Sequence, residues 1–201
     1  MHALGVRHML LEKLMRGDSS LDVGIAHLKN SKHQGKTALV SLASQIRPRT
    51  LAVQFLNPTL IACGLHVLSA AQNAVNAWFG GYAVSRGLNI EIAIYASGQR
   101  QIGPALDALG VRDGMSSLAL VVIGESPEVV QEVVRSIARQ TGTEIDPPFV
   151  LDEARSRIIM EHFSVGEVEL RAISESDDPK AVYAALCRCV ASRVSMVAID
   201  T

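Results

Sequence analysis

The sequence predicts a single α/β domain in which helices pack on a mixed β-sheet, with one extra helix before the first strand. Its 201 residues are 48% apolar, which is enough to bury one substantial core. Segments with the apolar spacing of helices alternate along the chain with short apolar runs typical of strands. No internal repeat or low-complexity tract interrupts this alternation.

Residues 1–50 are predicted to form an N-terminal extension that begins with a helix. Leu4, Met9 and Leu14 recur at helical spacing. Gly17 follows them in the position of a C-terminal cap. These features together predict a helix over the first sixteen residues.

A strand, a basic loop and a short helix complete this extension. Residues 21–25 alternate between apolar and polar or small side chains, as a half-buried strand does. The basic loop KNSKHQGKT follows. A short helix is predicted from Thr37 to Gln45, ending before Pro48, because proline disfavours helical geometry in the residue that precedes it.

Residues 51–201 are predicted to form the main α/β domain. The apolar segment LAVQFL at 51–56 is typical of a buried strand. A long helix is predicted through HVLSAAQNAVNAWF at 66–79, and the pair Gly80-Gly81 ends it. Its many alanines allow neighbouring helices to pack closely.

The next segment is ambiguous. Ile90, Ile92 and Ile94 alternate as in a strand, whereas the apolar residues of 102–109 have helical spacing. We expect a break between these two parts near Gly98.

The C-terminal part contains the clearest strand. The run SLALVVIG at 117–124 is typical of a central strand. Ser126 and the proline after it then open a predicted helix over 127–140. Further helices are predicted over 152–163 and 180–192, separated by the polar insertion SESDDPK, and VSMVAID is predicted as a terminal strand or tail.

Composition and charge restrict the possible functions. The formal net charge of −1 argues against a nucleic-acid binder that relies on phosphate neutralisation alone. Residues 1–50 nevertheless hold eight Lys/Arg against three acids, which allows either a basic binding face or an ordinary solvated surface. No apolar run reaches the roughly 18 residues that span a bilayer. We expect a cytoplasmic protein.

The residues that commonly carry catalysis or bind metals are poorly placed for either role. The three cysteines, Cys63, Cys187 and Cys189, lack paired C-x-x-C spacing and are expected to be reduced thiols. The six histidines are scattered and the chain has no G-x-S-x-G motif. No catalytic residue, metal or cofactor is therefore expected.

One alternative is a nucleotide-dependent enzyme. Gly35-Lys36-Thr37 matches the end of a phosphate-binding P-loop, in which Lys36 and Thr37 would contact phosphates and a metal ion. That motif also requires an earlier glycine, so that backbone N–H groups can surround the phosphate. Asn30 occupies its position.

Residues 97–101, Ser-Gly-Gln-Arg-Gln, form a candidate anion-binding segment. A glycine break followed by a helix start offers free backbone N–H groups, and the guanidinium of Arg100 adds donors suited to phosphate. An ordinary turn with Arg100 in solvent is the alternative interpretation.

The chain also resembles a known family. The runs LAVQFLNPTLIACGLHVLSAAQNAVNAWF and EIAIYASGQRQIGPALDALGVRDG resemble the TPRKB-like family of kinase-binding proteins, especially its archaeal members. The most specific feature is Glu91 a few positions ahead of S-G-Q-x-Q-I at 97–102, with small residues at Ala105 and Gly110. The resemblance covers residues 51–163 well and the C-terminal helix loosely.

This resemblance implies a non-catalytic regulatory subunit of KEOPS, the complex that places N6-threonylcarbamoyladenosine in tRNA. Such a subunit binds and activates the PRPK-like kinase/ATPase and helps to recruit tRNA through its 3′ CCA end. It reaches the threonylcarbamoyl-transferase subunit only indirectly. The resemblance implies no cofactor and no membrane association.

The resemblance also suggests two sets of binding residues. The expected tRNA-binding residues are Arg86, Gly98, Gln99, Arg100, Gln101 and His66. The expected kinase-binding residues are Val182, Leu186 and Val190, which share one face of the last helix, and Val197 in the tail. The same apolar stripe is equally compatible with an ordinary core.

Overall fold

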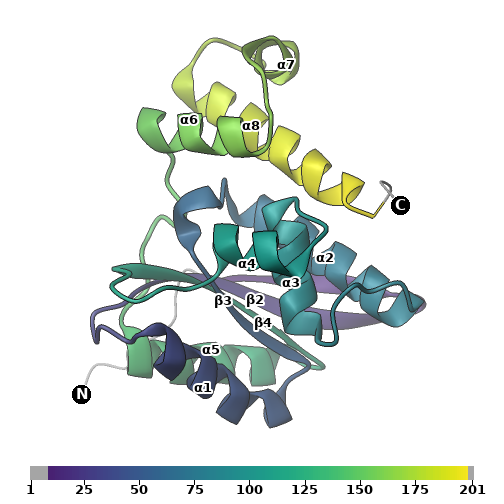
Figure 1. Ribbon diagram of the computed structural model, residues 1–201, viewed down its shortest axis with the longest axis vertical. Helices are drawn as coiled ribbons and strands as arrows, with labels where there is room; N and C mark the ends of the chain where they lie inside the picture. Colours follow the sequence, from purple (N-terminus) through teal and green to yellow (C-terminus); the bar gives the residue numbers. More distant parts are fainter. Residues whose placement is uncertain (1–8, 199–201) are drawn as a thin grey trace.

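A four-stranded sheet lies between layers of helices in the computed structural model, which describes residues 9–198 (Figure 1). Two helices cover one face of the sheet and three cover the other, and three C-terminal helices lie on the outside of that second layer. We call these last three helices the cap. The predicted α/β class is confirmed.

The sheet has the order β1-β2-β4-β3. Its strands are β1 (Leu10–Arg16), β2 (Ser19–Lys29), β3 (Ala52–Leu56) and β4 (Ser117–Gly124). All three pairings are antiparallel, where the sequence predicted a mixed sheet. The prediction was wrong because three consecutive helices return the chain from β3 to β4 in the opposite direction. β4 is the interior strand that its continuous apolar run predicted.

β1 corrects the prediction of an N-terminal helix. Leu10 and Leu14 are four residues apart, which is about one helical turn but also an even number that places both on one face of a strand. Strand pairing decides between these readings, because β1 forms a hairpin with β2. Gly17 adopts φ +56° in the two-residue turn rather than capping a helix. Residues 1–8 of the predicted helix lie outside the described residues.

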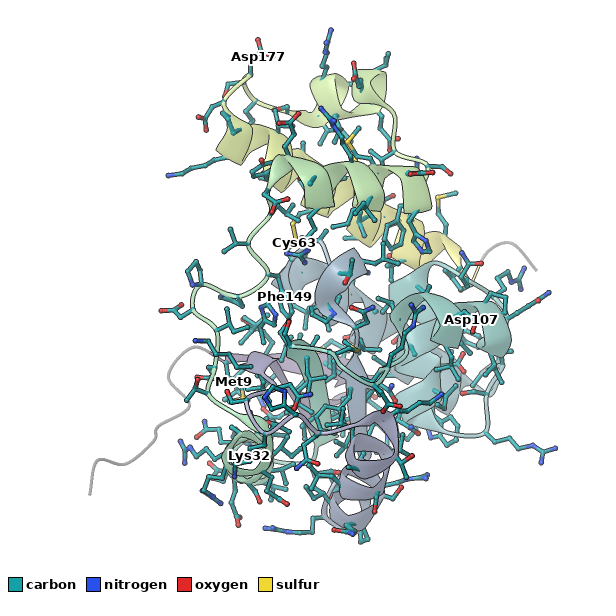
Figure 2. All side chains as sticks on the ribbon, turned by 60° about the vertical axis from the view of Figure 1, so that its left-hand side comes forward. Met9, Lys32, Cys63, Asp107, Phe149 and Asp177 are labelled. Carbon is teal, nitrogen blue, oxygen red and sulfur yellow. A yellow bond between two sulfur atoms is a disulfide. The ribbon has the colours of Figure 1, made fainter. Side chains whose placement is uncertain are left out.

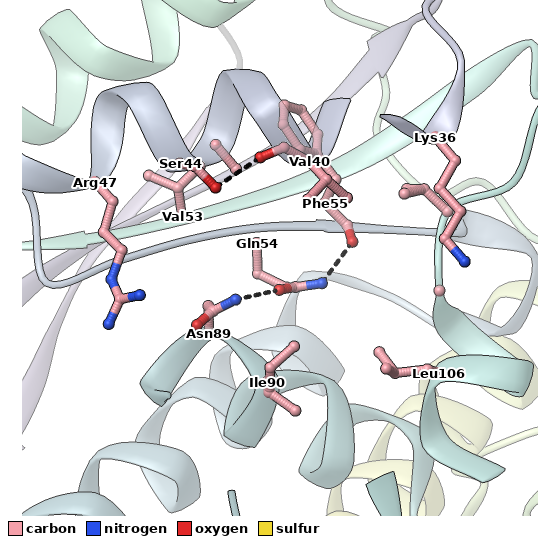
Figure 3. A pocket seen from close by; sticks show the side chains of 13 residues that line it. Lys36, Val40, Ser44, Arg47, Val53, Gln54, Phe55, Asn89, Ile90 and Leu106 are labelled. Atoms are coloured by element: carbon pink, nitrogen blue, oxygen red, sulfur yellow. Dashed lines mark hydrogen bonds between the residues drawn. The ribbon is translucent and has the colours of Figure 1, made fainter. Parts of the chain in front are cut away.

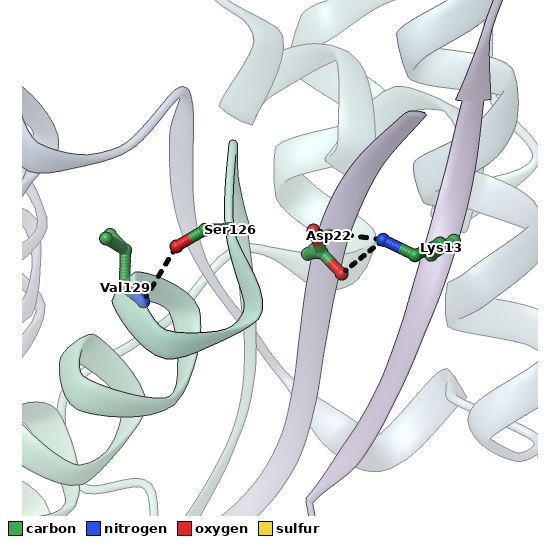
Figure 4. Close-up of polar contacts among 4 residues, drawn as sticks. All are labelled: Lys13, Asp22, Ser126 and Val129. Atoms are coloured by element: carbon green, nitrogen blue, oxygen red, sulfur yellow. Dashed lines mark hydrogen bonds and ion pairs between the residues drawn. The ribbon is translucent and has the colours of Figure 1, made fainter. Parts of the chain in front are cut away.

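An ion pair joins the two strands of this hairpin. The Nζ atom of Lys13 lies 3.2 Å from an Oδ atom of the buried Asp22 (Figure 4). Asp22 is aligned with Gly124 of β4 on its other side. Lys13 thus neutralises a carboxylate that the sheet would otherwise bury alone.

Two helices cover one face of the sheet. These are α1 (Lys36–Ile46), which continues into the short helix η1 (Arg47–Arg49), and α5 (Pro127–Thr141). The predicted N-cap of α5 is confirmed, because the Ser126 hydroxyl accepts a hydrogen bond from the Val129 N–H at 3.4 Å (Figure 4). Both helices pack on alternate side chains of β4.

The opposite face carries α2 (Gly64–Gly80), α3 (Leu88–Ser97) and α4 (Ile102–Leu109), preceded by the short helix η2 (Pro58–Leu60). α2 forms as predicted and ends at Gly81, which has φ +76°. Its alanines are fully buried against the sheet, α3 and the cap.

α3 resolves the ambiguous isoleucine segment as a helix. Nearly all of its residues are buried, because α2, α4, β3 and the cap surround it. A helix buried on all sides loses the polar face that identifies helical periodicity. The expected break is confirmed at Gly98, which ends α3 with φ +67°.

The cap consists of α6 (Glu153–His162), α7 (Glu167–Ile173) and α8 (Pro179–Met196), and α8 packs along α2. α8 continues through Val194 to Met196, so these residues are not the predicted terminal strand or tail. Residues 199–201 lie outside the described residues. Within residues 9–198, no helix combines the length and apolar character needed to cross a bilayer.

The cysteines differ from the expected reduced thiols. Cys63, just before α2, and Cys187 on α8 form a disulfide at the junction of the cap with the rest of the fold (Figure 2). Their positions are 124 residues apart in sequence, so local spacing could not reveal the pair. Cys189 is a free, buried thiol.

We predict that Leu120→Ala lowers the free energy of unfolding by about 2–5 kcal/mol, because Leu120 is fully buried at the centre of β4. Urea denaturation measures this change. The matched control is Leu65→Ala, whose side chain is 48% exposed and should cost clearly less. Equal losses from the two substitutions would contradict the assigned core.

Candidate nucleic-acid and protein interfaces

The expected tRNA-binding residues lie near the two ends of α3. Arg86 is exposed in the loop before the helix, while Arg100 and Gln101 follow it. Ten helical residues separate the two groups by roughly 15 Å. The structure therefore does not bring the two arginines into contact with a single anion.

Residues 97–99 owe their conformation to packing as well as to a turn. A side chain at Gly98 would be strained by the positive φ, and its Cβ would lie 3.1 Å from the Phe163 ring. The His162 Nε2 atom lies 2.8 Å from the Ser97 carbonyl oxygen, and the Gln99 N–H donates to the Ser97 hydroxyl at 3.2 Å. Gly98 is thus required by the fold whether or not it contacts RNA.

The start of α4 retains backbone donors beside Arg100. Gln101 is its N-cap residue, has extended geometry and forms no side-chain capping hydrogen bond. Arg100 is half-buried and Gln101 is exposed. This part of the predicted anion-binding segment is therefore available at the surface.

His66 is a correction to the predicted tRNA-binding set. Its side chain is fully buried, so it does not form a surface contact. The Nδ1 atom accepts from the Ala62 N–H at 3.2 Å, and the Nε2 atom lies 2.7 Å from the Ala96 carbonyl oxygen, to which it donates as the neutral tautomer. Burial lowers the pKa of His66 to about 4. Through its hydrogen bond with the Ala96 carbonyl oxygen, His66 fixes the C-terminal end of α3 from the interior of the protein.

Glu91, the most specific residue of the family resemblance, has a structural role. Its buried carboxylate accepts hydrogen bonds from the Val84 N–H at 3.2 Å and from the Ser85 N–H at 2.9 Å. The Ser85 hydroxyl donates a third at 2.7 Å. Glu91 therefore fixes the loop that presents Arg86.

An exposed tyrosine in this loop was missed by sequence analysis. Tyr82 is 54% exposed, and both Tyr82 and Arg100 lie close enough to Tyr95 to influence its phenol. Burial is the main cause that raises the pKa of Tyr95 to about 12. An exposed aromatic ring suits the stacking of unpaired bases. No sequence motif distinguished Tyr82 from the other tyrosines.

The predicted kinase-binding stripe is mostly core. Leu186 and Val190 are 1% and 0% exposed, and Val197 is also buried. All three belong to the hydrophobic cluster in which α8 packs against α2 and α3. The structure thus decides against them as direct kinase contacts. Only Val182 of the predicted set retains accessible surface.

Val182 lines a groove on the cap, which we call the cap groove. It has a volume of about 470 Å³ and lies among α6, α7 and the start of α8. Apolar surface comes from Met160, Leu170, Val182 and Tyr183. Ion pairs between Arg157 and Glu153, and between Arg171 and Glu167, lie among the lining residues. An apolar floor with a charged rim is typical of a protein interface.

Arg155 is a further residue that sequence analysis missed. Its guanidinium donates to the carbonyl oxygens of Pro58 at 2.9 Å and Val150 at 2.6 Å, and also to those of Thr59 and Ile61. Burial lowers its pKa below the usual range. One cation on α6 thereby holds the turn at η2 against the cap.

The structure does not support the P-loop hypothesis. The Asn30 side chain closes the basic loop through hydrogen bonds with the main chain of Gln34 and Met115. At the start of α1, the Asp113 carboxylate accepts a hydrogen bond from the Lys36 N–H at 2.7 Å. A carboxylate thus occupies the position at which a P-loop would hold phosphate.

The fold and these surfaces describe an interaction protein, and comparison with known proteins defines its class. A family model for the kinase-binding protein CGI-121 matches residues 28–197. The chain therefore belongs to this family of kinase-binding proteins, and the predicted resemblance is confirmed. A relative is the regulatory protein Cgi121 of Methanocaldococcus jannaschii, with 32% identity over 116 residues, which cover 57% of this chain and 72% of that protein.

We predict that His66 makes the fold sensitive to acid. Its pKa is about 4 in the folded protein, against an ordinary value of 6.5, so the unfolded chain takes up a proton first as the pH falls. Neutral His66 stabilises the fold fully above pH 6.5. This stabilisation is lost as the pH falls from 6.5 to 4, and the total loss in the free energy of unfolding is about 3 kcal/mol. Urea denaturation at pH 7 and pH 5 measures the loss.

The comparison is with His66→Gln, which cannot titrate. His27, whose pKa burial also lowers to about 4, contributes the same trend to both proteins, so the difference between them isolates His66. Parallel pH dependence in wild type and His66→Gln would show that His66 is not buried in its neutral form.

Proposed function

We propose that this chain is a non-catalytic regulatory subunit of the KEOPS tRNA-modifying complex. In this proposal it binds and activates the PRPK-like kinase/ATPase, helps to recruit tRNA through its 3′ CCA end, and reaches the threonylcarbamoyl-transferase subunit through the kinase. The main support is the kinase-binding family model that matches residues 28–197. The buried stripe of α8 means that the kinase contact must use other residues.

The cap groove is our candidate for the kinase surface. Val182 connects it to the part of the chain that the family resemblance suggested, and Tyr183 adds an aromatic side chain beside it. Ile158 and Val168 are further exposed apolar residues of the cap, at 48% and 84% exposure, although neither lines the groove.

We predict that Val182→Arg weakens kinase binding by about tenfold or more, because it places a charge on the apolar floor of the groove. Calorimetric titration with the purified kinase measures the affinity. Tyr183→Ala tests the same groove without adding a charge. Val84→Arg is the matched control, since Val84 is 55% exposed but lies in the loop before α3.

Thermal unfolding must first establish that each variant is folded. Folded Val182→Arg and Tyr183→Ala proteins with unchanged kinase affinity would exclude the cap groove. Failure of the wild-type chain to bind the kinase at all would exclude the whole proposed function.

The candidate tRNA-binding residues lie at the two ends of α3. Arg86, Arg100 and the uncapped start of α4 supply donors for phosphates, and Tyr82 supplies an exposed ring for an unpaired base. Single-stranded RNA ends are held by such a combination of phosphate contacts and stacking. His66 supports this surface only indirectly, by ordering the end of α3.

We predict that the double variant Arg86→Ala with Arg100→Ala binds tRNA more weakly, with a slope of affinity against salt concentration reduced by about 1 to 2. Its kinase affinity should be unchanged. Fluorescence anisotropy with intact tRNA and with tRNA lacking its CCA end measures both affinity and preference for the end. Unchanged tRNA binding would leave a kinase-binding module without the RNA role.

A further inference from the structure

A second groove lies at one edge of the sheet, between the helices that cover its two faces. It follows the outer edge of β3, with α1 forming one wall and the start of α3 and the end of α4 forming the other (Figure 3). Its volume is about 200 Å³. The apolar lining includes Val40, Val53, Phe55, Ile90 and Leu106. We call it the edge groove, because β3 is a terminal strand of the sheet.

Main-chain polar groups of β3 face this groove. The Asn57 N–H, just after the strand, turns away from β4 and donates to the Leu109 carbonyl oxygen at 2.8 Å. The carbonyl oxygen of Phe55 accepts a hydrogen bond from the Gln54 side chain at 2.8 Å within the groove (Figure 3). Alternate residues of a strand direct their N–H and C=O groups to the same side, so Val53 follows the same orientation.

The Gln54 side chain occupies the place of a missing strand. Its amide Nε2 donates to the Phe55 carbonyl oxygen of the same strand, and its Oε1 atom accepts from the Asn89 amide at 3.2 Å. A side-chain amide has the same donor and acceptor as a peptide unit. At the opposite edge of the sheet, Gln72 pairs in this way with both the N–H and the carbonyl oxygen of Met15, at 2.8 and 2.9 Å.

Two cations mark the ends of the edge groove. Lys36 and Arg47 line it at the start and just past the end of α1 (Figure 3). Neither side chain forms an ion pair with another residue in the part of the chain that the structure describes. Their separation along α1 is roughly 16 Å, which is about the length of five residues in a β-strand.

We propose that the edge groove binds an extended acidic peptide by strand addition to β3. About five residues of the peptide form a strand whose main chain pairs with Val53 and Phe55 in place of the Gln54 amide. Small apolar side chains of the peptide fill the groove. An acidic residue at each end of the peptide faces Lys36 or Arg47. The partner is therefore a protein with an exposed segment of this pattern. The site is separate from both surfaces of the proposed function.

A second copy of this chain fits the groove less well. Pairing of two β3 edges would bring Lys36 and Arg47 of one copy against the same cations of the other. Like charges at such short distance oppose association. Acidic residues at the peptide ends convert that repulsion into attraction.

The test uses the full chain and a synthetic peptide, acetyl-Gly-Asp-Val-Thr-Val-Asp-Gly-amide. Two-dimensional NMR of the labelled protein should show the largest shifts at the Val53 and Phe55 amides, and titration gives the affinity. Methylation of alternate peptide nitrogens, which removes strand hydrogen bonds, should weaken binding about tenfold or more. Equal binding of the methylated peptide, or no binding of the parent peptide, would overturn the proposal.

Variants of the groove test separately how charge and strand pairing contribute to the affinity for the peptide. Lys36→Glu with Arg47→Glu should weaken binding of the acidic peptide about tenfold or more and favour a peptide with lysines in place of the aspartates. Gln54→Ala should tighten binding several-fold, because no amide has to be displaced. The matched control Gln72→Ala, on the other sheet edge, should leave it unchanged.

Sedimentation velocity distinguishes peptide binding from self-association, because it measures the oligomeric state of the chain. A monomer at the concentrations of the titration is expected. Self-association that the acidic peptide fails to compete with would leave the peptide proposal intact only if peptide binding persists, whereas self-association that blocks peptide binding would assign the groove to a second copy and overturn the proposal. Kinase and tRNA binding should not change in any of these variants. A failure of the peptide proposal can therefore be distinguished from a failure of the proposed function.

Discussion

The structure depends on a sheet whose two faces are both apolar. Along β4, Leu120 and Val122 pack with α1 and α5, while Val121 and Ile123 pack with α2 and α3. Because alternate side chains of a strand point to opposite faces, helices must cover both sides. The cap then covers the outside of α2 and α3, and α3 becomes almost fully buried. Surface available to partners is left on loops, on the cap and along the sheet edges.

Polar contacts set the position of the cap. Arg155 holds the turn at η2, and Phe163 packs directly over Gly98. His162, beside Phe163, contacts the Ser97 carbonyl oxygen. The segment before α4 is therefore shaped by α6, which also forms a wall of the cap groove. The candidate kinase and tRNA surfaces thus share one supporting helix.

Sequence patterns predicted the elements that have a clear local signal, and failed where the surroundings of a segment decide its structure. β4, α2 and α5 had clear runs or caps, whereas the spacing of Leu4, Met9 and Leu14 predicted a helix where the chain forms β1 from Leu10 onward. For the sites, Arg100 and Gln101 were predicted because a glycine break and a guanidinium form a recognisable pattern, and the structure leaves both with accessible surface. Leu186 could not be assigned, because an apolar stripe has the same spacing in a core and in an interface. Tyr82 required knowledge of its exposure.

The position of β4 along the chain also governs how the fold can assemble. Its two neighbours in the sheet are residues 19–29 and 52–56, so both pairings join segments separated by some sixty residues or more. Such long-range pairing slows folding, because distant parts must meet before any hydrogen bonds form. During synthesis the hairpin and α2 emerge with no central strand to pack on. The apolar faces stay uncovered until residue 124 has left the ribosome, which makes this interval the one in which the chain is most exposed to aggregation or to chaperones.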